Sequence, residues 1–191
     1  HPWDEPFFGR DLGYLRAIGF DPRKPIVDDG TPNAQLLQRP GGMHRNADWN
    51  IIEIINGADT PELQKARVLW FALLAQGFVA SGTGNSDSHS MTDAQLGWAR
   101  NWVDAGSTLA TFDRNKFNTA LREGRFVAGN GVVVTVEVGP AAGPRRGLGF
   151  APFHPAANDV LHIEVRAAPR VPVEEVRVIT SRGEKVVASG T

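Results

Sequence analysis

The sequence GFVASGTGNSDSHS, residues 77–90, begins with a short apolar run that breaks into glycines and then into acidic and imidazole side chains. Residues 78–80 are expected to form a buried strand, and the glycine-rich residues 82–86 are expected to form the loop that leaves its carboxyl end. Ligand sites of α/β folds gather at this end of a strand. The stretch therefore predicts an α/β protein with a site at residues 87–89.

Asp87 and His89 are the first candidates for function, since they stand two residues apart. In extended backbone the side-chain direction alternates with period two, so both side chains would point to the same side. A carboxylate oxygen and an imidazole nitrogen that converge on one point suit a divalent cation such as Zn²⁺, Mn²⁺ or Fe²⁺. The alternative is that Asp and Ser in a glycine-rich segment only form a turn.

The residues upstream predict one β-α-β unit around this strand. Residues 50–55 form a nearly continuous β-branched run that an Asn-Gly pair ends, as in a strand buried on both faces. A Thr-Pro pair favours the start of a helix over residues 61–76, whose leucines recur at three- and four-residue spacing. A right-handed crossover would lay that helix on one face of a parallel sheet formed with residues 78–81.

Glu53 stands in the middle of the first of these strands. If the strand is buried on both faces, the carboxylate needs a metal ion, an arginine or several hydrogen-bond donors to offset the cost of its desolvation. If the strand lies at the edge of the sheet, Glu53 faces water instead. The sequence leaves both interpretations open.

The rest of the chain divides into a mixed part and a β-rich part. Residues 96–103 are compatible with a helix or a strand, and of the two we expect the strand. Residues 114–123 are expected to form a helix capped by Asp113. Toward the carboxyl end, β-branched runs alternate with Pro and Gly clusters and carry no helix signal. We therefore expect an α/β domain over residues 1–125 and a small antiparallel β-sandwich-like domain over residues 126–191.

Composition and charge limit the function classes. The chain has 20 Lys and Arg against 21 Asp and Glu, a net charge of -1 at pH 7, which offers no field to attract nucleic acid or an anionic membrane. The apolar run 68–74 is too short to span a bilayer. We expect a soluble protein whose compartment, cytoplasmic, periplasmic or secreted, is unknown. Because there is no cysteine, any transition metal must be held by His and carboxylates.

Several short segments follow one another along residues 1–135. They are His1-Pro2, the turn at 19–21, the strand at 52–57, the helix end at 70–77, the loop at 82–89, residues 97–103, and Gly124-Arg125 with Asn130-Gly131. In order and rough spacing they resemble the PHP (polymerase and histidinol phosphatase) superfamily, above all its carbaryl-hydrolase-like metallohydrolase branch. That branch has an Asn-His-Pro, a Gly-Phe-Asp segment, a Glu-Val-x-Asn-Gly strand and a Gly-x-Ser-Asp-Ser-His loop, followed by Gly-Tyr-Pro-Arg-Thr-Tyr-Val.

The resemblance implies a distorted β/α barrel that holds two or three divalent transition metal ions (Zn, Mn or Fe) at the carboxyl ends of its strands. His1, Asp87 and His89 would be metal ligands, and Glu53 matches a position near the metals. The ions would lower the pKa of a bound water and supply the nucleophile for ester hydrolysis. Phosphoesters are the substrates implied first, and carbamate or carboxyl esters second. Arg100 is a candidate for orienting an anionic substrate, with a surface salt bridge as the alternative.

One part of the family pattern is missing from the chain. The family opens with His-x-His and further His and acidic ligands, whereas the five His here, at positions 1, 44, 89, 154 and 162, include no such pair. His154 and His162 are expected to be structural or surface residues. We therefore expect the C-terminal portion of a barrel, completed by an upstream polypeptide segment or by an oligomer mate. The alternative is a non-catalytic binding or structural module, or an inactive fragment of the same fold.

Overall fold

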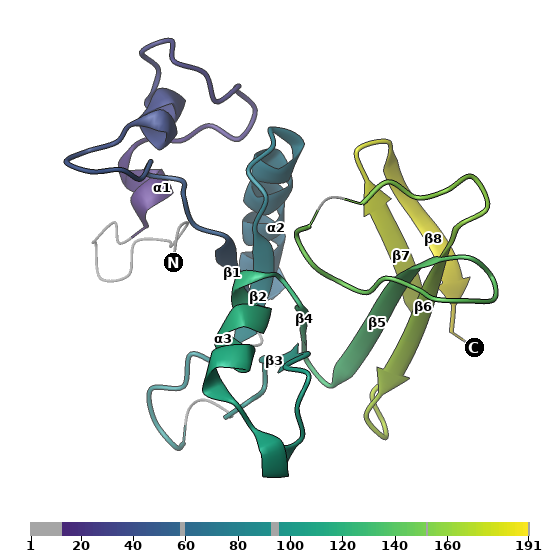
Figure 1. Cartoon of the computed structure of the whole chain (residues 1–191). Helices are drawn as coiled ribbons and strands as arrows, with labels where there is room; N and C mark the ends of the chain where they lie inside the picture. The colour runs from purple at the N-terminus through teal and green to yellow at the C-terminus, as the bar shows by residue number, and fades with distance from the viewer. Residues whose placement is uncertain (1–12, 58–59, 93–95, 152, 191) are drawn as a thin grey trace.

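The computed structural model describes residues 13–57, 60–92, 96–151 and 153–190. Its elements in chain order are α1 (Tyr14–Ala17), η1 (Pro32–Leu37), β1 (Ile51–Asn56), α2 (Thr60–Ala75), β2 (Ser81–Asn85), β3 (Arg100–Val103), η2 (Leu109–Thr111), α3 (Arg114–Arg122), β4 (Phe126–Gly129), β5 (Val132–Gly139), β6 (Val160–Ala167), β7 (Glu175–Thr180) and β8 (Gly183–Ser189). Figure 1 shows that the helices gather around β1 to β4, while β5 to β8 form a β-rich part beside them. The fold is therefore a mixed α/β arrangement.

The predicted β-α-β unit is confirmed. Strands β1 and β2 pair in parallel, and α2 connects them and packs on β1. The helix gains its packing from leucines on successive turns, of which Leu69 and Leu73 are buried. It ends before Gly77, whose φ of +83° is the left-handed conformation that glycine adopts readily after a helix.

The position of the second strand differs from the prediction. Residues 78–80 belong to the connection between α2 and β2. There the Phe78 N–H donates to the Leu73 carbonyl, and the Trp70 indole N–H donates to the Ala80 carbonyl. The strand is the glycine-rich stretch itself, residues 81–85. A Cβ on Gly82 would lie 2.4 Å from Cδ1 of Ile54, so the glycines admit the large side chains of β1. The glycines therefore mark close packing between two strands, and the predicted loop over 82–86 is wrong.

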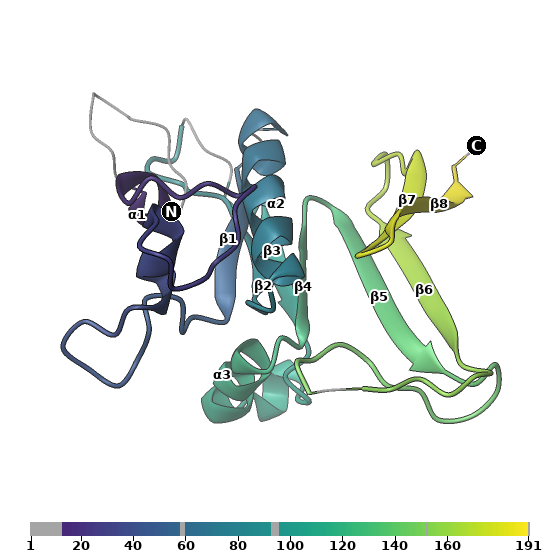
Figure 2. The same ribbon diagram turned by 90° about the horizontal axis from the view of Figure 1, so that it is seen from above.

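The buried core joins the segment before β1 to the β-α-β unit. Its members are Leu15, Phe20, Ile26, Leu36, Ala47, Ile52, Leu69, Leu73 and Ala80. The view in Figure 2 shows α1 on one side of β1 and α2 on the other. The core therefore packs α1 and the segment after it against the start of β1, against α2 and against the residue before β2.

Strands β3 and β4 form an antiparallel pair next to β2, and α3 lies between them in the chain. The predicted strand over 96–103 is confirmed for residues 100–103, and the predicted helix 114–123 is confirmed for 114–122. The carboxylate of Asp113 accepts hydrogen bonds from the backbone N–H groups of Asn115 and Lys116, as an N-cap does. Because β4 pairs with β3, the strand that opens the β-rich sequence belongs structurally to the mixed part.

The β-rich part consists of two antiparallel pairs, β5 with β6 and β7 with β8. The prediction of antiparallel strands without helices is confirmed for this region. Within the described residues the strands form four two-stranded sheets, and they do not close into a barrel. No helix of the described ranges is both long enough and apolar enough to cross a lipid bilayer.

Candidate functional site

The candidate site lies at the carboxyl ends of the parallel strands β1 and β2. Asn56 and Asn85 are register partners at the last position of each strand, and Gly57 N–H donates to the Asn85 carbonyl over 2.8 Å. Beyond this point the chain continues into residues 86–90. The ends of parallel strands are where ligand sites of α/β folds form, because neighbouring chain segments diverge there.

Asp87 and His89 contact each other at this edge. Oδ1 of Asp87 lies 3.0 Å from Nε2 of His89, and the two side chains are 51% and 81% exposed. Their convergence does not arise from extended backbone, because Asp87 has a φ of +48° in the left-handed region. A turn therefore brings the two groups together, so the predicted convergence holds while the extended conformation predicted for it is wrong.

The separation of these two atoms is compatible with a shared metal ion. Ligand atoms that bind one ion at about 2.0–2.2 Å lie about 3 Å apart when they occupy neighbouring coordination positions. A carboxylate oxygen and an imidazole nitrogen are also the donors that zinc, manganese and iron accept. Asp87 and His89 thus fit two positions of a metal coordination sphere, with their exposed side free for further ligands.

Glu53 is half-buried on β1 and accepts a hydrogen bond from Nδ2 of Asn85 over 2.7 Å. This geometry falls between the two interpretations of the sequence, since the carboxylate is neither deeply buried nor fully in water. The Asn85 amide in turn accepts from Nδ2 of Asn101 over 3.3 Å. Glu53 therefore belongs to a polar network that spans β1, β2 and β3 and includes Asn85, two residues before Asp87 in the chain.

Asn101 is a structural member of this network that sequence reasoning missed. Its Oδ1 accepts from Gly84 N–H over 3.0 Å, and its Nδ2 donates to the Gly84 carbonyl over 2.9 Å. The side chain thus replaces the backbone ladder that would otherwise join β2 to β3. A single amide directly before the apolar residues Trp102 and Val103 was the available signal.

Replacing Asn101 by alanine is expected to lower the free energy of unfolding by about 2 kcal/mol, because it leaves the buried N–H and C=O of Gly84 without partners. Asn101→Asp retains the acceptor but not the donor. Amide hydrogen exchange at Gly84 should therefore accelerate in Asn101→Ala and stay slow in Asn101→Asp. Equal exchange in both variants would contradict the proposed role of Oδ1.

The other predicted site residues lie as follows. Arg100 is exposed at the start of β3, and its guanidinium carbon lies 5.8 Å from the centre of the Trp102 ring, a cation–π contact. His1 lies outside the described residues. His44 lies 3.6 Å from an oxygen of Asp48, in a different region of the chain. The described ranges contain no group of three or more His, Asp and Glu side chains placed to hold a metal ion.

His154 and His162 lie in the β-rich part. His154 is exposed, and His162 Nε2 lies 3.3 Å from the Pro140 carbonyl oxygen. These positions agree with the structural or surface roles that the sequence favours for both.

Comparison of the chain with protein-family models, with curated proteins and with solved structures gives no match.

Proposed function

We propose that the chain is part of a metal-dependent hydrolase that acts on ester bonds, phosphoesters first and carbamate or carboxyl esters second. The observation that carries the proposal is the Asp87–His89 pair, whose Oδ1 and Nε2 atoms lie 3.0 Å apart at the carboxyl end of a parallel strand. The resemblance of the segments around this pair to PHP metallohydrolases supports the same chemistry.

In this proposal Asp87 and His89 bind a divalent transition metal ion, and His1 supplies a further ligand. Glu53 stands close to the metal site and orients Asn85 through the 2.7 Å hydrogen bond. Arg100 is exposed and orients the anionic part of the substrate. The bound metal ions would lower the pKa of a coordinated water and stabilise charge on the ester oxygen.

The complete site in this proposal holds two or three ions. Two side chains fill only part of the coordination sphere of one ion, which takes four or more ligands. We propose that an upstream polypeptide segment, or an oligomer mate, supplies the remaining His and carboxylate ligands and completes the barrel. The substrate is a small-molecule ester.

The proposal is tested by metal titration of the purified chain, with Zn²⁺ and Mn²⁺ added separately and binding measured by calorimetry. Asp87→Asn and His89→Ala should each weaken binding at least tenfold, since each removes one ligand. Asp28→Asn and His154→Ala are matched controls, because both side chains are exposed and lie elsewhere. Metal should also raise the melting temperature of the native chain, and of the two controls, but not of the site variants.

The alternative function is a non-catalytic binding or structural module in which Asp87 and His89 only close a turn. The direct contact between their side chains favours this alternative, since it satisfies both groups without an ion. Equal metal binding by native chain and Asp87→Asn would decide for the alternative. Two further results together would also favour the alternative. The purified chain would contain no bound metal, and its melting temperature would not change on dialysis against a chelator.

A further inference from the structure

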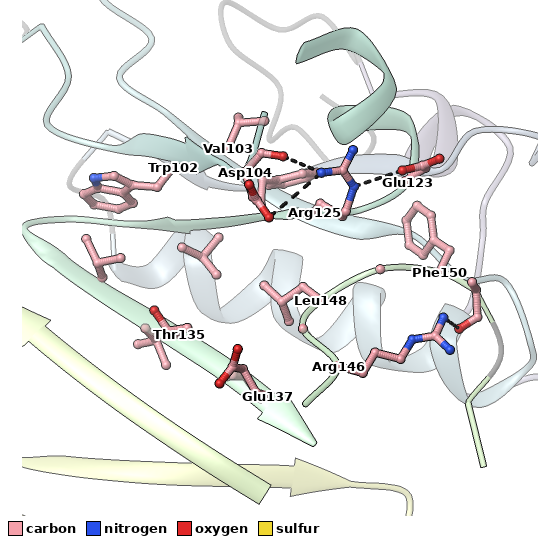
Figure 3. A pocket seen from close by; sticks show the side chains of 18 residues that line it. Trp102, Val103, Asp104, Glu123, Arg125, Thr135, Glu137, Arg146, Leu148 and Phe150 are labelled. Carbon is pink, nitrogen blue, oxygen red and sulfur yellow. Dashed lines mark hydrogen bonds and ion pairs between the residues drawn. The ribbon is translucent and has the colours of Figure 1, made fainter. Parts of the chain in front are cut away.

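A cavity of 660 Å³ lined by β3, β4 and β5 lies outside the candidate site, and Val134 and Val136 supply part of its apolar surface. Figure 3 shows the guanidinium of Arg125 between Asp104 and Glu123. Its Nε donates to Glu123 over 2.9 Å, and its Nη1 donates to the Asp104 carbonyl over 2.6 Å. Because these charges are engaged with one another, the cavity does not select a charged ligand.

A second concave region, the amino-end pocket, has a volume of 640 Å³. It is lined by residues of the segment 44–50 before β1, by the segment 76–79 before β2 and by Arg122. Ser81 N–H donates to the Asn50 carbonyl over 2.9 Å and so joins the starts of the two strands. Because β1 and β2 are parallel, the length of β2, about 17 Å, separates this pocket from the strand ends that carry the candidate site.

Arg45 is held in this pocket by three contacts. Its backbone N–H donates to Oδ2 of Asp48 over 2.8 Å, and its Nε donates to Oδ1 of the same carboxylate over 3.0 Å. Its guanidinium carbon lies 5.6 Å from the centre of the Phe78 ring, a cation–π contact. The backbone N–H and the guanidinium of Arg45 hold the pKa of the Asp48 carboxyl below its ordinary value, so the ion pair persists at neutral pH.

Most of the hydrogen-bond donors of Arg45 remain open. Within the described ranges, Nε is the guanidinium atom that has a hydrogen-bond partner, and the two Nη atoms have none. These two atoms carry four N–H donors in one plane. Asp48 and Phe78 therefore fix the orientation of the guanidinium and leave its outer fork for a further partner.

Arg122 lines the same pocket from the last turn of α3. Asn50 fixes the main chain at this position, since its Nδ2 donates to the Arg122 carbonyl over 2.8 Å. The Arg122 guanidinium makes no hydrogen bond or ion pair with any residue in the described part of the chain. A second guanidinium group thus lines the pocket with all of its donors open.

The pocket keeps a positive charge after its ion pairs are counted. The carboxylate of Asp48 neutralises Arg45 and leaves Arg122 unpaired. His44, whose Nδ1 lies 3.6 Å from Oδ2 of Asp48, adds a further positive charge when it is protonated. Guanidinium groups that share a pocket repel each other, and an anion between them removes that repulsion. The pocket therefore favours an anionic ligand.

The donors and the apolar walls narrow the class of anion. A guanidinium binds phosphate oxygens through two parallel hydrogen bonds, and a tetrahedral phosphate offers oxygens to two guanidinium groups at once. A carboxylate has only two oxygens in one plane and a single charge. Trp49, Phe78 and Val79 supply apolar surface beside the donors, and the volume is in the range of small-molecule sites.

We propose that the amino-end pocket binds a small organic phosphate, whose phosphate group lies between the guanidinium groups of Arg45 and Arg122. The apolar part of the ligand contacts Trp49 and Val79. Asp48 does not exclude the phosphate, because both of its oxygens accept hydrogen bonds from Arg45. The site is separate from the proposed metal centre and needs no metal ion.

The test is an NMR titration of the whole, metal-free chain with phenylphosphonate, whose P–C bond an esterase does not hydrolyse. We expect saturable shifts at the indole N–H of Trp49 and at the amides of Phe78 and Val79. The amides of Asp87 and His89 should not shift, which separates this pocket from the metal centre. Benzoate should bind about tenfold more weakly or worse, because it offers fewer charge-assisted hydrogen bonds, and neutral benzyl alcohol more weakly still.

A protein variant makes the same test from the other side. Arg122→Gln should weaken phenylphosphonate binding about tenfold or more. Its melting temperature should equal that of the native chain, since the guanidinium has no partner to lose within the described ranges. Arg114→Gln on the same helix is the matched control, because Arg114 is exposed and lies outside the pocket. Arg45→Gln should also weaken binding, and if it does not fold, Arg122→Gln still decides.

Four results would overturn the proposal. The first is the absence of shifts at Trp49, Phe78 and Val79 at millimolar phenylphosphonate, and the second is equal binding by the native chain and Arg122→Gln. The third and fourth are equal affinities for benzoate or for benzyl alcohol, which would contradict the preference for a phosphate group. None of these results bears on the proposed hydrolase chemistry, which the metal titration tests separately.

Discussion

Replacing Leu73 by alanine is expected to lower the free energy of unfolding by about 2–5 kcal/mol, because the lost side chain leaves a cavity in the core. Leu73 is 0% exposed on α2 and belongs to the cluster that includes Leu15, Leu36 and Ile52. Urea-induced unfolding followed by tryptophan fluorescence measures the change, since Trp49 and Trp70 pack against this cluster.

Val68→Ala is the matched control on the same helix. Val68 is 59% exposed, so little buried surface is lost, and alanine favours the helix more than a β-branched residue does. The control should change the free energy of unfolding by less than about 0.5 kcal/mol. A similar loss in both variants would mean that α2 is not anchored through its Leu73 face.

Replacing Asn33 by alanine is the second change with a large expected effect, about 3 kcal/mol or more, because several backbone groups lose their partners together. Asn33 is 1% exposed. Its Oδ1 accepts from Asp21 N–H over 2.9 Å, and its Nδ2 donates to the carbonyls of Asp21 and Lys24 over 2.9 and 3.0 Å. The side chain thus holds the turn after α1, and the variant should unfold at lower urea concentration.

Asn118→Ala serves as the control for this prediction, since Asn118 is exposed on α3. Its replacement by the best helix former should leave stability unchanged or raise it slightly. If Asn33→Ala were as stable as the control, water would be replacing the lost hydrogen bonds, and the turn would be more open than the structure shows.

The β-α-β unit is predictable because its signals are local. The β-branched run of residues 51–55 favours a strand wherever it lies, and the leucine spacing of residues 61–75 favours a helix with an apolar face. Asp113 likewise caps its helix through bonds to its nearest neighbours in sequence. Each of these features depends on residues that lie close to one another in the sequence.

The glycines of residues 82–84 show where local reasoning fails. A glycine signal is the same for a turn and for a close approach between strands. What decides here is the bulk of Ile54, nearly thirty residues earlier, which occupies the space a Cβ on Gly82 would need. No property of residues 77–90 alone contains that information.

The candidate site is likewise only partly predictable from the sequence. Asp87 and His89 are recognisable from their spacing and chemistry, but the left-handed turn at Asp87 that joins them is not. The amide of Asn101 becomes meaningful only when β3 lies beside β2, because its partners belong to Gly84. The sequence pattern identifies candidate residues, whereas the packing of the strands determines which of their side chains are in contact.

The order of elements, a parallel α/β unit followed by antiparallel strands, follows from the amino-acid sequence, and so does the choice of Asp87 and His89 as a pair. That the glycine-rich residues 81–85 form the second strand, and that a cavity opens beside Val134 and Val136, follows only from the packing of distant segments. The two kinds of feature differ in the sequence distance over which their causes act. Backbone propensity acts over a few residues, whereas strand position and cavity shape depend on side-chain volume and open peptide groups from distant segments.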